Sequence, residues 1–577
     1  MSKTSSSVSF YVALGFVFVL GVCVVLYANA PILMSFPFPW ILPSNASASE
    51  SSSDVSTAAV VSRSLSESLL RADTSFLSSS ALEGRGVGTR GEDTTVSYVA
   101  SRFLAAGLTP AFTAAGHPSF FQNVPLVGQI ARPSSMSLGF SSSSLPPTAE
   151  PLHLEWITDF VAESDLYDEQ ITLANLPLCF VGYGINAPER GWNDYAGLDV
   201  SGCVVVAFVN DPFDGETLTY YGRWTYKQEE ARRQRALGII LIHTEASAGY
   251  PFQVLVNGAV GEQLQLDRGS EPPAGSLLQI KAWITASQAA ALAELCGSSL
   301  GQWEATRDRQ GGVAASQQLE AVTISGNMSF TARHLMGKNV GGLMPSRSGD
   351  TSECTLISAH HDHLGMVGTS IFHGALDNAV GVGLVLNMLQ AFASSSLKPA
   401  GCVAFATWTA EEAGLLGAEY FVSHRQSNHF KIKSLFNIDG ANIWGRTYDI
   451  VGLGGEFSEM GDIWQKAAEK QGLTVSGDLL PGQGSFFRSD QLPFYRVGIP
   501  CIYLETGHKF VGQPESFATD VENAYISEHY HKPSDVYSDS WDLNGAIQQM
   551  KVIVEAVFLT LGQSSISVHS RQMNIAG

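Results

Sequence analysis

Basic residues are scarce in this chain of 577 residues, which has 33 Lys and Arg against 54 Asp and Glu and a formal net charge of −21. Proteins that bind nucleic acid need a basic surface to neutralise phosphates. The composition therefore argues against a nucleic-acid partner. Such an acidic chain would favour cationic substrates, although a need for solubility is the simpler explanation of the charge.

Cysteine is also scarce, with seven residues and no cluster, which excludes a small scaffold held together by disulfides. Three cysteines begin or lie in apolar runs typical of strands, where a buried free thiol is the expected state: Cys354, Cys402 and Cys501. Three others could include one disulfide, but the sequence does not pair them: Cys179, Cys203 and Cys296.

No Lys or Arg occurs between Lys3 and Arg63, and residues 8–27 are almost wholly apolar. An apolar run of about 20 residues can span a bilayer. Because Ala28-Asn29-Ala30 resembles a cleavage site, residues 1–30 are predicted to be a signal anchor or a signal peptide, and the length of the run favours a single-pass anchor. The rest of the chain would then enter the secretory pathway, either membrane-anchored on the lumenal or extracellular side or secreted.

Two Asn-x-Ser sequons fit the secretory route and are predicted glycosylation sites, at Asn45 and Asn327. Residues 31–62 are rich in Ser, Ala and Val and have few bulky side chains, which predicts a flexible stalk.

The sequence pattern of the remaining residues changes along the chain. Residues 63–149 carry two helical patterns, residues 150–318 are β-rich, and residues 319–565 alternate strands with helices, before a tail at 566–577. Strands that alternate with helices predict an α/β fold with a doubly wound, mostly parallel sheet. The β-rich segment is interpreted as an inserted accessory domain.

Histidines and acids follow the strand-like runs of residues 319–565 at five places: 360–363, 377, 411–412, 439 and 528–531. The carboxyl ends of parallel strands meet at one rim of an open sheet, and ligands bind there. We therefore expect these side chains to converge on one site.

The adjacent acids Glu411 and Glu412 repel each other unless a cation takes one of them and the other acts as a base. Imidazole together with carboxylate suits zinc, and the lack of a cysteine cluster argues against a structural thiolate site. There are more carboxylates than one tetrahedral ion uses, and a carboxylate can bridge two metals about 3.5–4 Å apart. The prediction is two Zn²⁺ ions that share an aspartate and a water, with one glutamate left to take the proton of that water.

Further motifs in the same part of the chain carry a family resemblance: Arg488-Ser-Asp490, Pro493-Phe494, Gly498-Ile-Pro500, Tyr503-Leu-Glu-Thr-Gly507 and Tyr530-His-Lys-Pro-Ser-Asp535. With the sites above, the chain from about Leu65 to its final helix resembles the M28 family of dizinc aminopeptidases, in the subgroup with an inserted protease-associated (PA) domain. The resemblance implies a zinc-peptidase-like fold, with a PA domain at 150–318 and the peptidase domain at 319–565. It also implies a metallopeptidase acting on the N-termini of peptides or proteins.

The resemblance further implies a role for each of seven residues. Asp377 would bridge both zinc ions, with His360 and Asp439 completing one site, Glu412 and His531 completing the other, Glu411 as general base, and Asp362 accepting a hydrogen bond from the ring of His360. The neighbours His361, His363 and His529 are expected not to bind metal. The chain departs from many relatives at Leu376, where they carry an acid, and at Gln491, where they carry a histidine. These departures leave open the substrate pocket rather than the metals.

Three other functions remain compatible with the sequence. A carboxypeptidase or dipeptidase would use the same dizinc site, and a glutaminyl cyclase would need only one zinc. A receptor-like ectodomain would bind a partner without catalysis, but every ligand position is filled, which disfavours it. The preferred side chain of the substrate, the oligomeric state and the role of the insert do not follow from the sequence.

Overall fold

The computed structural model of the chain describes residues 57–569, except for 147, 149, 214–217, 245–246, 248–250, 268, 270–276, 309–316 and 397. The predicted signal anchor or signal peptide at 1–30 and the sequon at Asn45 lie outside the described residues.

The first sheet contains a parallel core of four strands in the order β23–β20–β16–β19. Antiparallel strands flank this core on both sides, and β22 lies parallel to β21 at one edge. The strands are β16 (Glu353–His360), β19 (Cys402–Trp408), β20 (Lys431–Ile438), β23 (Cys501–Glu505), β21 (Asp449–Leu453), β22 (Thr474–Ser476), β15 (Gln317–Met344), β4 (Phe121–Ala131), β13 (Gln263–Leu266) and the short β1 (Thr109–Pro110). This arrangement confirms the predicted mostly parallel α/β sheet.

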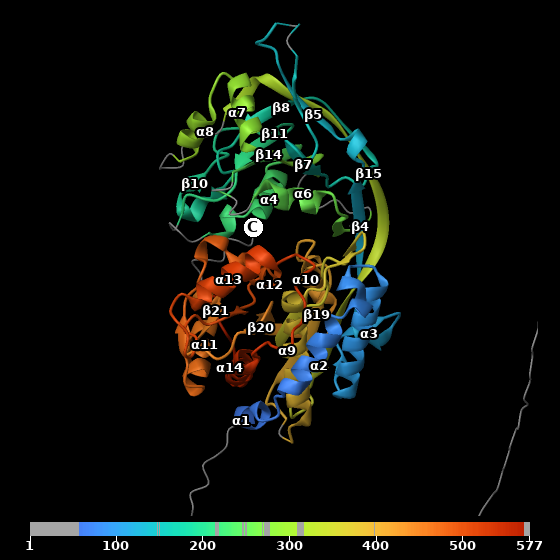
Figure 1. Cartoon of the computed structure of the whole chain (residues 1–577), viewed down its shortest axis with the longest axis vertical. Helices are drawn as coiled ribbons and strands as arrows, with labels where there is room; N and C mark the ends of the chain where they lie inside the picture. The colour runs from blue at the N-terminus through green and yellow to red at the C-terminus, as the bar shows by residue number, and fades with distance from the viewer. Residues whose placement is uncertain are drawn as a thin grey trace, which may run out of the picture. The chain divides into compact units, whose positions relative to one another are not determined.

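Both faces of the parallel core are apolar, because successive side chains of a strand point to opposite faces. On β16, Ile357 packs in one buried cluster and Leu356 in the other. The first cluster is covered by helices α9 (Val380–Ser394), α11 (Met460–Lys470) and α14 (Asn544–Leu561), and the second by α10 (Leu416–Ser423) and α12 (Gln491–Arg496). The sheet is therefore doubly wound, as predicted (Figure 1).

The N-terminal helices α2 (Glu67–Leu77) and α3 (Arg90–Ala105) pack into the first of these clusters. Helix α9 with the turn before it, residues 375–394, is apolar and long enough to cross a membrane, but 94% of this segment is buried inside the fold. That degree of burial is typical of a core helix.

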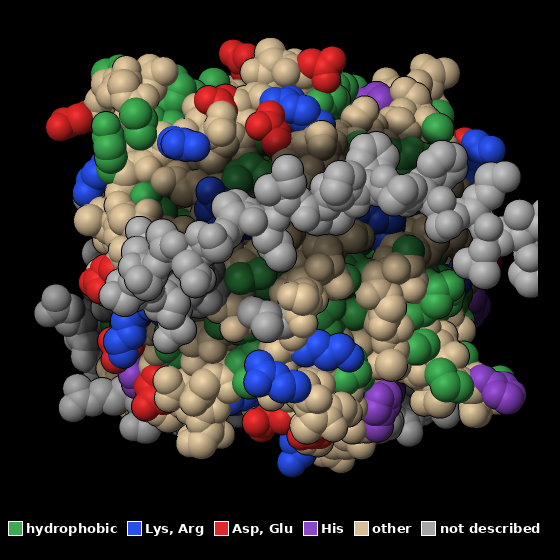
Figure 2. Space-filling view, turned by 90° about the horizontal axis from the view of Figure 1, so that it is seen from below, with side chains coloured by type: hydrophobic (Ala, Val, Ile, Leu, Met, Phe, Trp, Pro, Cys, Tyr) green, Lys and Arg blue, Asp and Glu red, His purple; other side chains and the backbone are tan. Residues whose placement is uncertain are grey.

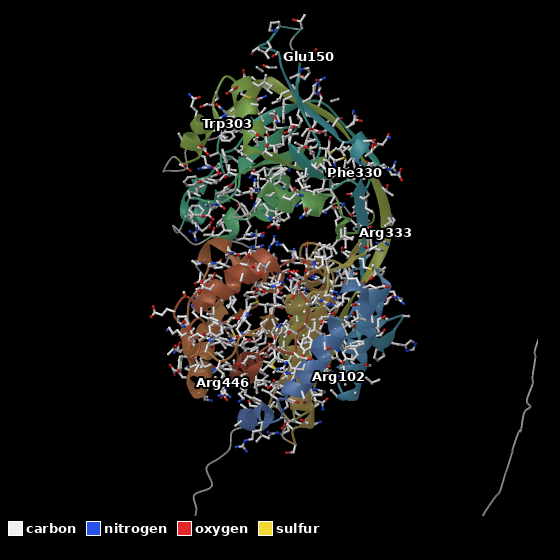
Figure 3. All side chains as sticks on the ribbon, viewed as in Figure 1. Arg102, Glu150, Trp303, Phe330, Arg333 and Arg446 are labelled. Carbon is white, nitrogen blue, oxygen red and sulfur yellow. A yellow bond between two sulfur atoms is a disulfide. The ribbon has the colours of Figure 1, made fainter. Side chains whose placement is uncertain are left out.

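A second sheet has its own parallel core, in the order β8–β11–β12–β14. Its strands are β5 (Ser137–Ser142), β6 (Leu152–Leu154), β7 (Phe160–Glu163), β8 (Gln170–Phe180), β11 (Val204–Phe208), β12 (Gly238–His243) and β14 (Ile280–Thr285). It packs with helices α4 (Trp224–Arg233), α6 (Phe252–Ala259), α7 (Ala286–Leu295) and α8 (Leu300–Arg307) around buried side chains such as Trp303 (Figure 3).

The long strand β15 belongs to both sheets (Figure 1). Its first part pairs with β5 over 322–327, and its later part pairs with β4 over 330–340 and with β19 over 340–344. Phe330 still packs in the core of the second sheet, whereas Arg333, three residues on, binds the carboxylate of Glu262 through two hydrogen bonds of 2.6 Å (Figure 3). The second sheet thus includes residues before 150, in β5, and after 318, in β15. Its assignment as a PA domain stays a prediction.

The predicted stalk is wrong at its end, because Thr57–Ser62 forms helix α1. Ala58 and Val61 are buried, and α1 packs against α14. The two apolar side chains are spaced three residues apart on one helical face, which is sufficient to dock a short helix. Within the predicted tail, Val568 pairs with Ser458.

The structure contains two disulfides in its described part, Cys179–Cys203 and Cys354–Cys402. The first confirms that one disulfide lies among Cys179, Cys203 and Cys296. The second shows that the expectation of free thiols is wrong for Cys354 and Cys402, while Cys501 is free and buried. Cys354 and Cys402 are register partners on adjacent parallel strands, with Cα atoms 4.5 Å apart, so their side chains meet on one face of the sheet.

The predicted glycosylation site Asn327 is exposed on β15, and its side-chain oxygen accepts a hydrogen bond of 3.0 Å from Thr172. On the face drawn in Figure 2, the described charged side chains of both signs are scattered and do not form a basic stripe.

Candidate metal centre

The candidate site lies where the order of the parallel strands reverses. From β16 the chain passes to β19 on one side and then returns to β20 on the other side. His360 ends β16, Glu411 and Glu412 follow β19, and Asp439 follows β20. Ligands bind in the crevice at such a switch point of an open α/β sheet, so the topology brings these four side chains to one place.

The first group of potential metal ligands surrounds the ring of His360, which is 1% exposed. Its Nε2 atom lies 2.9 Å from Oδ1 of Asp439 and 3.3 Å from Oδ1 of Asp377. The ligand atoms of these three residues all lie within 4.8 Å of one another, which is close enough to hold one ion.

The second group surrounds His531, whose Nε2 atom lies 3.3 Å from Oδ2 of Asp377 and 3.0 Å from Oε2 of Glu412. The two oxygens of Asp377 thus face different histidines, Oδ1 toward His360 and Oδ2 toward His531. A carboxylate in this position has one oxygen for each of two neighbouring cations.

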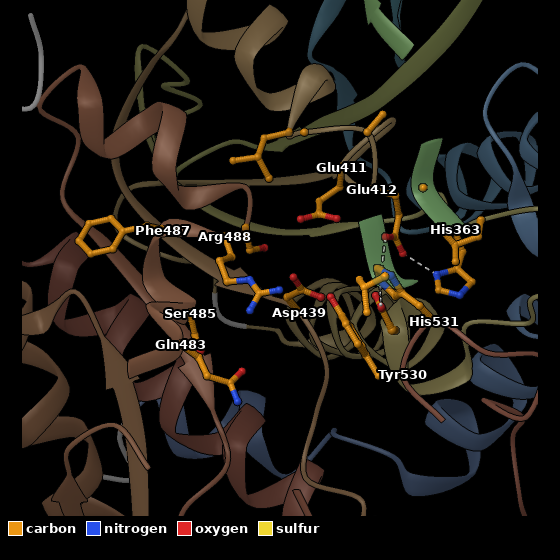
Figure 4. Close-up of a pocket in the computed structure, with 18 of the residues that line it drawn as sticks. His363, Glu411, Glu412, Asp439, Gln483, Ser485, Phe487, Arg488, Tyr530 and His531 are labelled. Atoms are coloured by element: carbon orange, nitrogen blue, oxygen red, sulfur yellow. Dashed lines mark hydrogen bonds and ion pairs between the residues drawn. The ribbon is translucent and has the colours of Figure 1, made fainter. Parts of the chain in front are cut away.

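The structure also brings His363 into the second group, where a non-ligand was expected. Its Nδ1 atom lies 2.6 Å from Oε1 of Glu412 (Figure 4), and His363, Asp377 and Glu412 can together hold an ion. By contrast, His361 turns away from both groups and contacts the Thr407 hydroxyl at 3.0 Å.

His529 lies outside both groups as expected, with its Nδ1 atom 3.1 Å from the carbonyl of Ser534.

Asp362 is in the predicted place, but its carboxylate has a different partner from the one expected. It accepts hydrogen bonds from the backbone N–H groups of Glu411 at 3.1 Å and Glu412 at 3.4 Å. The Nδ1 atom of His360 faces the backbone carbonyl of Asp362 at 3.3 Å and is 3.8 Å from its carboxylate. Asp362 therefore holds the loop of the two glutamates with its side chain and meets His360 with its main chain.

The two adjacent glutamates differ electrostatically. Burial raises the pKa of Glu411 well above its usual value, and the charges of Asp439 and Asp490 raise it further against the opposing effect of His360. Burial and Asp377 also act to raise the pKa of Glu412, but His531 and His363 outweigh them and lower it to about 2. Glu412 is thus held as an anion, while Glu411 holds a proton readily.

Residues 339–556 match the model of Peptidase family M28. This part of the chain belongs to peptidase family M28. We call residues 339–556 the M28 region. The chain is 29% identical over 208 residues to leucine aminopeptidase 2 of Trichophyton rubrum, covering 34% of this chain and 39% of that protein. It is 30% identical over 200 residues to an aminopeptidase of Pseudomonas aeruginosa, covering 33% of this chain and 35% of that protein. The chain therefore matches less than half the length of either relative.

Two solved structures are similar over most of the chain. An aminopeptidase from Aneurinibacillus sp. strain AM-1 has 17% identity and a TM-score of 0.48, covering 87% of this chain and 96% of that one. A zinc aminopeptidase from Bacillus subtilis has 18% identity and a TM-score of 0.40, covering 85% of this chain and 94% of that one. Because both TM-scores are below 0.5, neither of these structures supports a family or a function for this chain.

Residues around Asp377 in the M28 region hold it in position, although no role was predicted for them. The Asp535 carboxylate accepts the backbone N–H of Leu376 at 3.0 Å and that of Asp377 at 3.1 Å. Asn378 donates to the Ile438 carbonyl and accepts from the Gly440 N–H, both at 2.9 Å, which ties the turn to the end of β20. Asp535 belongs to a motif noted in the sequence, but its hydrogen bonds depend on a chain separation of more than 150 residues.

A buried cation also supports the turn before Asp377. Arg85 is 1% exposed and donates hydrogen bonds to the carbonyls of His361, His373 and Gly374 at 2.7–2.9 Å. Its sequence context, Glu83-Gly-Arg-Gly86, resembles any glycine-rich turn, so the sequence alone offers no signal for this role.

The potential metal ligands of the M28 region open into a cavity of about 2570 Å³. Glu411, Asp439 and His531 line it together with side chains of the second sheet and its helices, such as Trp224 and Trp283. The cavity is large enough for a peptide, because ligand pockets for small molecules measure about 300–1,000 Å³.

Proposed function

We propose that this protein is a zinc-dependent aminopeptidase that hydrolyses N-terminal peptide bonds. The proposal rests on one observation above all, the placement of Asp377 with one carboxylate oxygen toward His360 and the other toward His531. The names of the relatives of the M28 region, leucine aminopeptidase 2 and aminopeptidase, support the same reaction.

The residues present fit two zinc ions. Two histidines and three carboxylates form two overlapping groups, and mixed imidazole and carboxylate ligands are characteristic of catalytic zinc. Three carboxylates gathered around the buried His360 and the partly exposed His531 would repel one another without cations. His360, Asp377 and Asp439 would hold one ion, and Asp377, Glu412 and His531 the other, with His363 close enough to support the second.

Zinc bound there would polarise the scissile carbonyl and acidify water. Glu411 would act as the general base: its pKa is raised, it lies beside both groups without being needed by either, and its Oε2 atom is 4.0 Å from Nε2 of His360. It would take the proton of the attacking water and return that proton to the leaving amine. Asp362 would orient Glu411 through its hydrogen bond to the Glu411 backbone.

We also infer that the chain passes through the secretory pathway, as the N-terminal segment predicts. The disulfides Cys179–Cys203 and Cys354–Cys402 support this, because disulfides persist in oxidising compartments and are rare in the cytosol.

The test is the digestion of one peptide in two forms, with a free N-terminus and with an acetylated N-terminus, followed by mass spectrometry. We expect stepwise loss of N-terminal residues from the free peptide alone, and no loss after treatment with a chelator. Release of C-terminal residues would indicate a carboxypeptidase on the same site and would overturn the proposal, as would cleavage of dipeptides only.

A further inference from the structure

Among the carboxylates outside the metal-ligand groups that line the same cavity, three affect one another: Asp478, Glu505 and Glu522. We call them the acidic pocket. Glu505 ends β23, Glu522 lies in helix α13 (Phe517–Glu528), and Asp478 follows β22. In the described part of the chain, none of the three forms an ion pair with Lys or Arg.

The three carboxylates lie close enough to affect one another. Burial raises the pKa of Glu505 to about 8, with further contributions from Asp478 and Glu522, and burial also raises the pKa of the other two. The hydrogen bonds that offset this are few: Ser485 faces Glu505, and the Leu480 N–H donates to Asp478 at 2.8 Å. Such a cluster of acids is electrostatically unfavourable until a cation enters it.

Tyr503 is an independent sign that a ligand binds there. It is 9% exposed, lines the cavity, and its hydroxyl makes no hydrogen bond to any residue that the structure describes. Tyr503 precedes Glu505 by two residues on β23, so both side chains lie on the same face of the sheet. The Tyr503 hydroxyl is open to the cavity, where a ligand could hydrogen-bond to it.

The acidic pocket also adjoins the metal centre. Ile438 and Leu504 are register partners on the adjacent parallel strands β20 and β23, so Asp439 and Glu505, the residues that follow them, lie next to each other at the same end of the sheet. A substrate residue held at the metal centre therefore has the acidic pocket within reach of its side chain.

We propose that the acidic pocket binds the cationic side chain of an N-terminal lysine or arginine, which makes the enzyme selective for basic N-terminal residues. This rests on the proposed aminopeptidase function. An ammonium or guanidinium group would form charge-assisted hydrogen bonds with Glu505 and its neighbours and with the hydroxyl of Tyr503. The long apolar stem of either side chain would span the distance from the metal centre along the wall of the cavity.

The experiment compares the 4-nitroanilides of lysine and norleucine, whose side chains have the same unbranched stem and differ in the ammonium group. We expect the zinc-loaded full chain to hydrolyse the lysine substrate with a kcat/KM at least about tenfold higher, the change expected for one charge-assisted hydrogen bond. Glu505→Gln should remove most of this preference through a higher KM for the lysine substrate, with norleucine hydrolysis retained. The matched control is Glu515→Gln, an exposed glutamate outside the cavity, which should keep the wild-type preference.

Equal or better hydrolysis of norleucine by the wild type would overturn the inference, as would an unchanged preference in both Glu505→Gln and Glu522→Gln. Loss of all activity towards both substrates in the wild type would instead contradict the proposed function. Calorimetric titration with calcium tests whether the acidic pocket is a metal site and not a site for a cationic side chain. Calcium binding that disappears in Glu505→Gln, together with no lysine preference, would identify a metal site and overturn the proposal.

Discussion

Replacement of Glu411 by glutamine separates proton transfer from metal binding at this site. The substitution preserves the size and shape of the side chain but removes its ability to take a proton. Glu411 lies near enough to His360 and Glu412 for these three to hold an ion. However, His360 with Asp377 and Asp439, and Asp377 with Glu412 and His531, each supply three ligands without Glu411. We therefore expect Glu411→Gln to keep both zinc ions.

The expected loss of activity follows from the role of the side chain. A positioned general base contributes about 10²–10⁴-fold to a rate, which corresponds to about 3–5 kcal/mol of transition-state stabilisation at 1.36 kcal/mol for each factor of ten. The loss should appear in kcat, with KM nearly unchanged, because Glu411 acts in the transition state rather than in ground-state binding.

The assay is the kcat and KM for an aminoacyl 4-nitroanilide, measured beside the zinc content of the same preparation by elemental analysis. Glu353→Gln is the matched control, since Glu353 is exposed at the opposite end of the strand that carries His360. A Glu411→Gln enzyme with more than about a tenth of the wild-type kcat would refute the role of Glu411 as base. Loss of zinc in that variant would show that Glu411 is a ligand.

Three further outcomes follow from the structure. Asp377→Asn should lower bound zinc below two ions per chain in elemental analysis after dialysis, because both groups share this carboxylate; full zinc content would exclude a bridging role. Asp165→Asn should lower the free energy of unfolding in urea by about 3–5 kcal/mol, because Arg232 is left without the carboxylate that it binds with two hydrogen bonds of 2.6 Å. Lys281 and Arg232 lower the pKa of Asp165 in the fold although burial opposes this. The contribution of Asp165 to stability is therefore present above its unfolded pKa of about 4 and is lost as the pH falls further, and the variant should lack this acid-dependent loss. Cys354→Ser with Cys402→Ser should lower the free energy of unfolding in urea under non-reducing conditions by about 4 kcal/mol, the loop entropy for a sequence separation of 48; a variant as stable as the wild type would contradict this contribution.

The parallel sheet was predictable from the sequence because each core strand is a short apolar run followed by polar residues. Strand β19, Cys402–Trp408, is apolar along nearly its whole length, and the alternation of strands with helices predicted for residues 319–565 is present in the structure. The convergence of His360, Glu411 and Asp439 followed from the same reasoning, since the carboxyl ends of parallel strands meet at one rim.

The remaining features depend on contacts between distant parts of the chain. The Cys354–Cys402 disulfide needs the two strands to be neighbours in register, which local patterns do not reveal. His363 joins the second ligand group because the chain turns after β16, and Asp535 reaches the backbone of Asp377 across more than 150 residues. The Ser-rich composition before residue 62 led to the prediction of a stalk. Two apolar side chains in that segment, Ala58 and Val61, nevertheless dock helix α1 on the core.

Anomalous diffraction from crystals of the zinc-loaded protein, recorded above and below the zinc absorption edge, shows directly whether two zinc ions flank Asp377. We expect two peaks about 3.5–4 Å apart, one beside His360 and Asp439 and the other beside Glu412 and His531. A single peak, or two peaks that do not share Asp377, would contradict the proposed two-zinc site.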